Sequence, residues 1–134
     1  MTDFLPVGDY LPHRAPMLLL DRVIQVSDER VVCEVTINHH GVLAPFLNTQ
    51  GELPAWFGVE IMAQTVGVWS GFHARQRGDR DIRPGMLLGG RGYRAAAATF
   101  AADSTLRVEM HLLMRDDKLG SFDGEIRSQD QVLA

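Results

Sequence analysis

The stretch LPAWFGVEIMAQTVGVWSGF, residues 53–72, constrains the fold of this chain more than any other segment. It contains one carboxylate, Glu60, and one amide, Gln64, among residues that are otherwise apolar, small or hydroxyl-bearing. A helix that is apolar on nearly every side is enclosed by other elements or by lipid. Because Pro54, Glu60 and Gln64 argue against a membrane span, we expect a buried helix that begins within a residue or two of Pro54 and runs to about Arg75.

The segments around this helix show the period-two alternation of half-buried antiparallel strands. The alternation covers residues 31–37, 105–114 and 119–128, and residues 17–26 and 86–95 are plausible strands too, the second interrupted by glycines. RDDKLG, residues 115–120, has the composition of a hairpin turn, and the final SQDQVLA predicts a turn followed by the start of one more strand. The pattern predicts an α+β fold in a single domain over residues 1–134: one long central helix wrapped by a curved antiparallel β-sheet.

Composition excludes several classes of protein. The 134 residues carry 13 basic and 17 acidic side chains, a net charge of −4 that gives no electrostatic footprint for nucleic acid or an anionic membrane. The single cysteine, Cys33, cannot form an internal disulfide and is expected to be inert core. The N-terminal MTDFLPVGDY lacks the basic and apolar regions of a signal peptide. We therefore expect a cytoplasmic protein with no membrane insertion, no nucleic-acid partner, no metal and no cofactor.

Two stretches resemble a known family. LPHRAPMLLLDRV, residues 11–23, looks like the N-terminal signature of the 3-hydroxyacyl-acyl carrier protein dehydratases of bacterial fatty acid synthesis. PAWFGVEIMAQ, residues 54–64, is similar to that family's central helix, in which a proline precedes the catalytic acid by six residues and Met-Ala-Gln follows. LGGRGYRA, residues 88–95, resembles more loosely the family's glycine-containing strand. The resemblance is strongest to the dehydratase-like proteins of aryl polyene and related polyketide-type lipid pathways, and it implies the hot-dog fold.

The resemblance breaks at the family's second catalytic group, a histidine in a Gly-His-Phe-Pro turn after a Pro-Phe pair. The matching run here is APFLNTQGELPAW, residues 44–56, where Asn48, Thr49 and Gln50 stand at the expected place of the histidine. Dehydration of a 3-hydroxyacyl thioester needs a base for the α-proton, an acid for the departing hydroxyl and donors for the enolate oxygen. The usual base is therefore missing from this segment.

The resemblance assigns the acid to Glu60. The backbone amides near Ala55 and Trp56, in the first turn of the expected helix, can hold the thioester oxygen because the first N–H groups of a helix have no intrahelical acceptor. A different interpretation makes Glu60 a structural acid, hydrogen-bonded in the core or at a dimer seam, since an unpaired buried carboxyl is costly.

Further polar residues have a functional interpretation, a structural interpretation or both. Gln64 lies one helical turn after Glu60 on the same face, and either orients the acid or is a simple core amide. Asn48 is a candidate substrate contact because it occupies the place of the missing histidine. His13 either braces a turn or replaces the base, and for His39 and His40 we expect exposure at the end of a strand.

Three functions stay open. The first is a 3-hydroxyacyl-thioester dehydratase, a lyase of fatty acid or polyketide-type biosynthesis, with a rearranged base. The second is a non-catalytic or half-site subunit of a heteromeric dehydratase, and the third is a hot-dog acyl thioesterase in which Glu60 activates water. The resemblance implies an acyl carrier protein or coenzyme A thioester as substrate. It also implies a homodimer, or a heterodimer with a sister hot-dog subunit, because in that family one site draws its acid and its base from different subunits.

Overall fold

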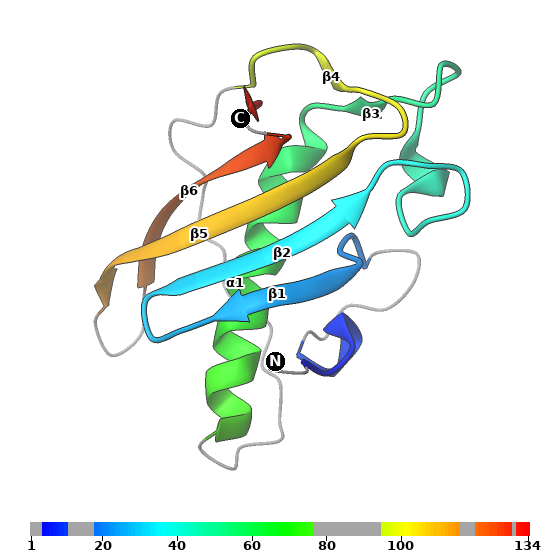
Figure 1. Cartoon of the computed structure of the whole chain (residues 1–134). Helices are drawn as coiled ribbons and strands as arrows, with labels where there is room; N and C mark the ends of the chain where they lie inside the picture. The colour runs from blue at the N-terminus through cyan, green and yellow to red at the C-terminus, as the bar shows by residue number, and fades with distance from the viewer. Residues whose placement is uncertain (1–3, 11–17, 77–94, 116–119, 130) are drawn as a thin grey trace.

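The computed structural model describes residues 4–10, 18–76, 95–115, 120–129 and 131–134. One long helix, α1 (Phe57–Gln76), lies across one face of a five-stranded antiparallel sheet (Figure 1). In spatial order the strands are β1 (Arg22–Val26), β2 (Arg30–Thr36), β5 (Thr105–Arg115), β6 (Gly120–Ser128) and β7 (Gln131–Val132). A separate two-stranded sheet pairs β3 (Leu53–Pro54) with β4 (Thr99–Phe100), and the short 3-10 helices are η1 (Val7–Asp9) and η2 (Ala44–Phe46).

The alternation in the sequence places the core as predicted. In the β2–β5 register Val31 is opposite Met110, Cys33 opposite Val108, and Val35 opposite Leu106, and all six side chains are buried. The helix turns one face towards them, because its buried positions recur at helical spacing. The buried residues of the helix are Gly58, Ile61, Gln64, Thr65, Val68, Trp69 and Gly71. The sequence prediction of one helix packed against an antiparallel sheet is therefore confirmed.

The helix begins one residue after the predicted range, because its first residue, Phe57, is three residues beyond Pro54. Pro54 does not open the helix but ends β3, where it is opposite Thr99. Ala55 and Trp56 then form a turn, closed by a hydrogen bond of 3.0 Å from the Gly58 N–H to the Ala55 carbonyl, and the helix begins at Phe57. Proline is compatible with an extended strand end because it lacks an N–H to pair. The end of the helix at Gln76 agrees with the prediction.

The turn and strand predicted for the final residues are present. β7 follows a turn at Gln129 and pairs with the end of β6. Beyond β7, the Leu133 N–H donates to the Ile126 carbonyl at 2.8 Å, and the Leu133 carbonyl accepts from the Ala96 N–H at 2.8 Å. The predicted strand 86–95, apart from Ala95, and the centre of the predicted hairpin turn 115–120 lie outside the described residues.

Two contacts fix the far half of α1. The backbone of Tyr10 lies directly against Gly71, where a side chain of any size would collide with the Tyr10 carbonyl. The Trp69 indole N–H points at two carbonyls of the β1–β2 turn, 3.1 Å from that of Ser27 and 3.2 Å from that of Asp28. These two contacts hold the C-terminal half of the helix against the N-terminal segment and the β1–β2 turn.

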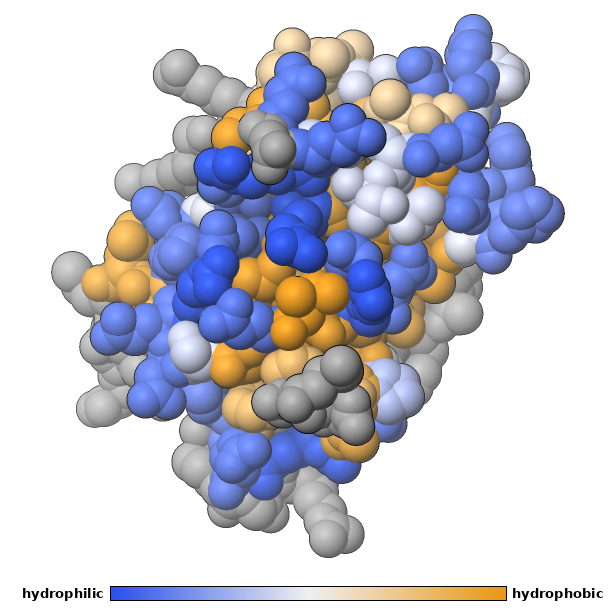
Figure 2. All heavy atoms as spheres, viewed as in Figure 1, coloured by the Kyte–Doolittle hydropathy of each residue, from blue (hydrophilic) through white to orange (hydrophobic). Residues whose placement is uncertain are grey.

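The sheet face turned away from α1 is polar. Figure 2 shows this face towards the viewer, covered mostly by hydrophilic residues with apolar atoms exposed between them. Ion pairs join neighbouring strands there, including Arg22–Glu34 and Arg30–Glu109. In the part of the chain that the structure describes, no helix is long and apolar enough to cross a membrane.

Candidate functional site

Glu60 lies in the first turn of α1 and is half-buried. One turn further on, the Gln64 side chain is almost completely buried, with 1% of its surface exposed. The Gln64 Nε2 donates to Glu60 Oε1 at 3.4 Å, a long and therefore weak hydrogen bond. The Gln64 Oε1 accepts a stronger bond of 2.8 Å from the Leu19 N–H, just before β1. The amide thus joins the acid to a backbone segment 45 positions away in sequence.

The backbone amides at the start of α1 are not equally available. The Ala55 N–H donates to the Ala98 carbonyl at 2.9 Å, so this predicted donor is already engaged by the fold. Within the described residues, the N–H groups of Trp56 and Phe57 have no acceptor. Unpaired N–H groups at a helix start can receive the partly negative oxygen of a thioester or enolate. The structure therefore moves the candidate pair from Ala55 and Trp56 to Trp56 and Phe57, and sequence reasoning missed Phe57.

Aromatic rings surround the start of the helix. The Trp56 side chain is 70% exposed and stacks on Phe57, with ring centroids 5.7 Å apart. Phe57 in turn contacts Phe46 of η2 at 5.1 Å. Large exposed aromatic rings of this kind occur at sites where another molecule covers them. An apolar wall therefore stands beside the free amides.

Asn48 has a local structural role. Its Oδ1 accepts from the N–H groups of Gln50 and Glu52, at 3.0 and 2.9 Å, and its Nδ2 donates to Glu52 Oε1 at 3.3 Å. This is the way in which asparagine stabilises turns. Gly51, within the same turn, has a φ of 76° that favours glycine. The turn explains Asn48 without a ligand, and the predicted substrate contact stays a prediction.

Of the histidines named above, His13 lies outside the described residues. His39 and His40 are exposed as expected, and the His39 ring lies beside Gly51. Among the described residues, no group of three or more histidine, cysteine or carboxylate side chains is arranged to hold a metal ion.

Cys33 does not belong to the site. It lies in the core of β2, and burial raises the pKa of its thiol to about 12, although a hydrogen bond with Thr65 acts in the opposite direction. A thiol that stays protonated near neutral pH is a poor nucleophile. The structure thus agrees with the expectation of an inert core cysteine.

Comparison with known proteins decides the family. The family model described as ApeP-like, ApeP dehydratase, matches residues 5–134. The chain is also 53% identical to a chain in the structure of the dehydratase heterocomplex ApeI:P from Xenorhabdus doucetiae, with a TM-score of 0.94 over 98% of this chain and 86% of that one. The chain belongs to the ApeP-like dehydratase family. The resemblance inferred from residues 11–23 and 54–64 is therefore confirmed, as is the hot-dog fold.

More distant relatives of this ApeP-like chain are dehydratases of the FabZ type. It is 42% identical over 74 residues to the 3-hydroxyacyl-acyl-carrier-protein dehydratase FabZ of Streptococcus uberis, and 45% identical over 74 residues to that of Streptococcus mutans. Each match covers 51% of this chain, which spans about half (49%) of the length of these curated relatives. The TT0310 protein of Thermus thermophilus, 15% identical with a TM-score of 0.57 over 84% of this chain and 82% of its own, shares the fold alone.

Proposed function

We propose that this chain takes part in the dehydration of 3-hydroxyacyl thioesters to enoyl thioesters, with Glu60 as the general acid. The carrying observation is the arrangement at the start of α1. There the only carboxylate of the helix lies within one turn of the Trp56 and Phe57 backbone N–H groups, for which the described part of the chain offers no acceptor. Family membership and the dehydratase names of the relatives support the same reaction.

The reaction divides into roles that this geometry can serve. A base removes the proton α to the thioester carbonyl, and the electron pair moves towards the carbonyl oxygen, which the Trp56 and Phe57 amides stabilise. The pair then forms the α,β double bond as the C–O bond breaks. Glu60 protonates the departing hydroxyl, which leaves as water, and the former α-proton stays on the base until solvent removes it. Gln64 acts through Glu60 as a positioning residue.

The base has two candidate sources. One is a histidine-bearing sister hot-dog subunit, a hypothesis supported by the heterocomplex in which the 53% identical relative was solved. The other is His13 of this chain. The substrate would be a thioester of an acyl carrier protein or of coenzyme A, and the single cysteine is compatible with a cytoplasmic setting. If His13 is the base, a homodimer would be sufficient. If a sister subunit supplies the base, the assembly would be a heterodimer.

The decisive experiment is Glu60→Gln, which keeps the shape and hydrogen bonding of the side chain but removes the titrating proton. We expect dehydration to fall by about 10²-fold or more with folding intact. The matched control is Glu29→Gln at an exposed turn, which should keep full activity. Both variants are assayed with a 3-hydroxyacyl carrier thioester, alone and with a candidate sister subunit. Full activity of Glu60→Gln in both settings would make Glu60 structural, and release of free thiol without enoyl product would indicate a thioesterase.

His13→Ala separates the two sources of the base. If His13 is the base, the lone protein is active and this substitution lowers its rate about as much as Glu60→Gln. If a sister subunit supplies the base, the lone protein is inactive, and the His13→Ala variant keeps the activity of the complex. Light scattering of the lone protein and of its mixture with the sister subunit gives the oligomeric state. A stable monomer in both samples would contradict a site shared between subunits.

A further inference from the structure

The outer face of the main sheet, which is turned towards the viewer in Figure 2, carries charged side chains in rows that cross the strands. We call one of them the basic row. Its members lie opposite one another on β1, β2, β5 and β6, and in that order they are Arg22, Glu34, Arg107 and Arg127. In the neighbouring acidic row, two residues away along each strand, Glu109 of β5 is directly opposite Glu125 of β6. The function proposed above uses neither row.

The arginines of the basic row are more exposed than its one acid. The Arg107 side chain is 57% exposed, against 15% for Glu34. Glu34 accepts a hydrogen bond of 2.5 Å from Arg22, but the Arg107 guanidinium lies 3.6 Å from it, beyond hydrogen-bond distance. Exposed ion pairs contribute little to stability. Arg107 can therefore take a carboxylate of another molecule as its partner at little cost.

The order of the charges works against the stability of the isolated sheet. Arg107 is directly opposite Arg127, and like charges at opposite positions of neighbouring strands are destabilising. The same holds for Glu109 and Glu125. Exchanging the residues at 125 and 127 would place unlike charges opposite each other at both positions and would keep the ion pair within β6. Because folding alone favours the exchanged order, the collection of like charges into rows indicates a contact outside the chain.

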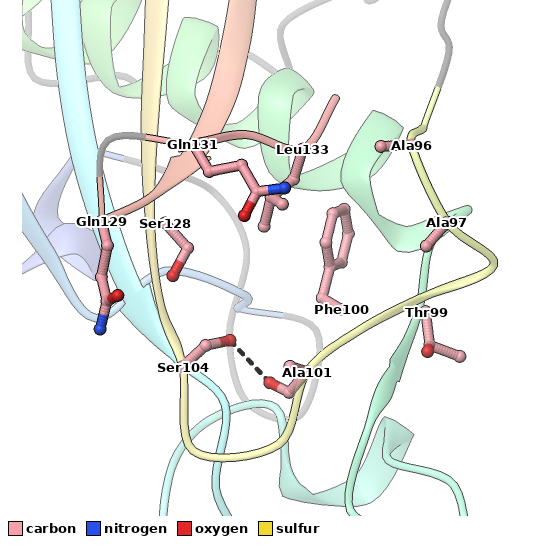
Figure 3. A pocket seen from close by; sticks show the side chains of 10 residues that line it. All are labelled: Ala96, Ala97, Thr99, Phe100, Ala101, Ser104, Ser128, Gln129, Gln131 and Leu133. Atoms are coloured by element: carbon pink, nitrogen blue, oxygen red, sulfur yellow. Dashed lines mark hydrogen bonds between the residues drawn. The ribbon is translucent and has the colours of Figure 1, made fainter.

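Other kinds of partner fit this pattern less well. An acidic protein or a nucleic acid would be attracted by the basic row but repelled by the acidic row beside it, and by the net charge of −4. A small anion would need an enclosing site. A pocket of about 380 Å³ reaches Ser128, the residue after Arg127 (Figure 3), but none of the ten residues that line it is charged. A surface that carries both signs of charge in the opposite order is the better fit.

We propose that the outer sheet face pairs with the same face of a second copy of this chain. A two-fold axis can lie between two facing sheets, parallel to the rows and midway between them. It places each basic row over the acidic row of the other copy, so that the surface is complementary to itself. Arg107 then lies over Glu109 of the other copy, and Arg127 over its Glu125. The contact is on the side of the sheet away from α1 and is independent of the dehydration function proposed above.

The expected contact is weak and sensitive to salt. With strands about 4.8 Å apart and residues about 3.3 Å apart along each strand, the rows and their neighbours cover roughly 400 Å² on each copy. The total of about 800 Å² is below the size of standard stable interfaces. Exposed charges are also screened over a Debye length of about 10 Å at 0.1 M salt. Self-association should therefore weaken by about tenfold or more between about 0.05 and 0.5 M NaCl.

Sedimentation of the full chain measures this association, and an exchange of two residues tests its origin. Glu125→Arg combined with Arg127→Glu keeps the composition and the net charge but breaks both rows. We expect self-association to weaken by about tenfold or more, with equal or higher stability in urea. The matched control is Asp9→Arg combined with Arg75→Asp, at exposed positions outside the sheet, and it should associate like the wild type.

Two complementary variants give a stricter test. The acidic-face variant, Arg107→Glu with Arg127→Glu, has two acidic rows. The basic-face variant, Glu109→Arg with Glu125→Arg, has two basic rows. Neither should self-associate, because like rows face each other, whereas the equimolar mixture should associate at least as strongly as the wild type. Circular dichroism shows that each variant is folded.

Three results would overturn the proposal: no self-association of the wild type at low salt, equal association of the wild type and the exchanged variant, or no association in the mixture of folded complementary variants. If the acidic-face variant instead loses only the binding of a sister subunit, the basic row serves that partner and the proposal is wrong. Dehydration assays of the same variants are read separately, because Glu60 lies on the other side of the sheet.

Discussion

Gln64→Leu should separate the two interpretations of Gln64, an orienting residue or a simple core amide. The side chain is nearly completely buried and connects two groups: its Oε1 accepts from the Leu19 N–H at 2.8 Å, and its Nε2 donates to Glu60 at 3.4 Å. Leucine has a similar volume, so little cavity is created. The substitution therefore removes hydrogen bonds without removing much packing.

The expected loss of stability follows from the Leu19 amide. Leu19 is 1% exposed, so its N–H cannot be compensated by bulk water after the substitution. A buried donor left without an acceptor costs about 1–3 kcal/mol. The weaker 3.4 Å contact with Glu60 adds little to this value, since Glu60 is half-buried and can reorient towards solvent. The free energy of unfolding should thus fall by about 1–3 kcal/mol, mostly through Leu19.

Urea unfolding gives this free energy, and dehydration kinetics at temperatures where the variant is folded give the effect on Glu60. If Gln64 orients the acid, kcat falls by about tenfold while KM changes little. The control Thr65→Val removes a neighbouring buried hydroxyl, which bonds the Ile61 carbonyl of the same helix and the Cys33 thiol but not Glu60, and should leave kcat unchanged. A stability loss without a loss of kcat would make Gln64 a core amide only. An unchanged free energy of unfolding would refute the role of the Leu19 bond.

Two further predictions concern the fold around the site. Gly71→Ala should lower the free energy of unfolding by about 1–3 kcal/mol in urea, because the methyl group collides with the Tyr10 backbone, whereas the exposed Ser70→Ala should change it little. Equal stability of both variants would contradict the close packing of Tyr10 on α1. With its thiol pKa raised to about 12 by burial, folded Cys33 should be about one part in 10⁴ thiolate at pH 8 and resist iodoacetamide until urea unfolds the protein. Rapid labelling of the native protein, measured by mass spectrometry, would show that the β2 core opens readily.

Local periodicity in the sequence was sufficient to predict the main elements. The pairing of segments far apart in the sequence could not be predicted from it. The alternation of Val31, Cys33 and Val35 predicts both the strand and its buried face without reference to any other segment. The start of α1 depends instead on the pairing of residues 53–54 with residues 99–100, which no local pattern contains. Proline six residues before an acid suggests the first helical position, yet the tertiary pairing makes it the end of a strand. The predicted boundary of an element is wrong where pairing with a distant segment determines the real one.

The candidate site, too, could be predicted from the sequence only in part. Glu60 could be found from sequence because it is the lone carboxylate of an apolar segment, which is itself unusual. The bond from the Leu19 N–H to Gln64 joins residues 45 positions apart and leaves no signature in composition or spacing. The engagement of the Ala55 amide likewise follows from where the Ala98 carbonyl lies. Residue type predicts which chemistry is possible, and tertiary contacts decide which atoms are available for it.

The turn before β3 favours a base supplied by another subunit. In the resembling family this segment carries the histidine, but here Asn48 closes it through both atoms of its amide, and Gly51 adopts a left-handed conformation inside it. In this turn both polar atoms of the Asn48 side chain take part in local hydrogen bonds. The groups proposed for the other half of the chemistry are present, because Gln64 contacts Glu60 and, within the described residues, the Trp56 and Phe57 N–H groups have no acceptor. We therefore infer that a chain with these groups, which uses the segment of the base for a turn, contributes one half of the proposed site.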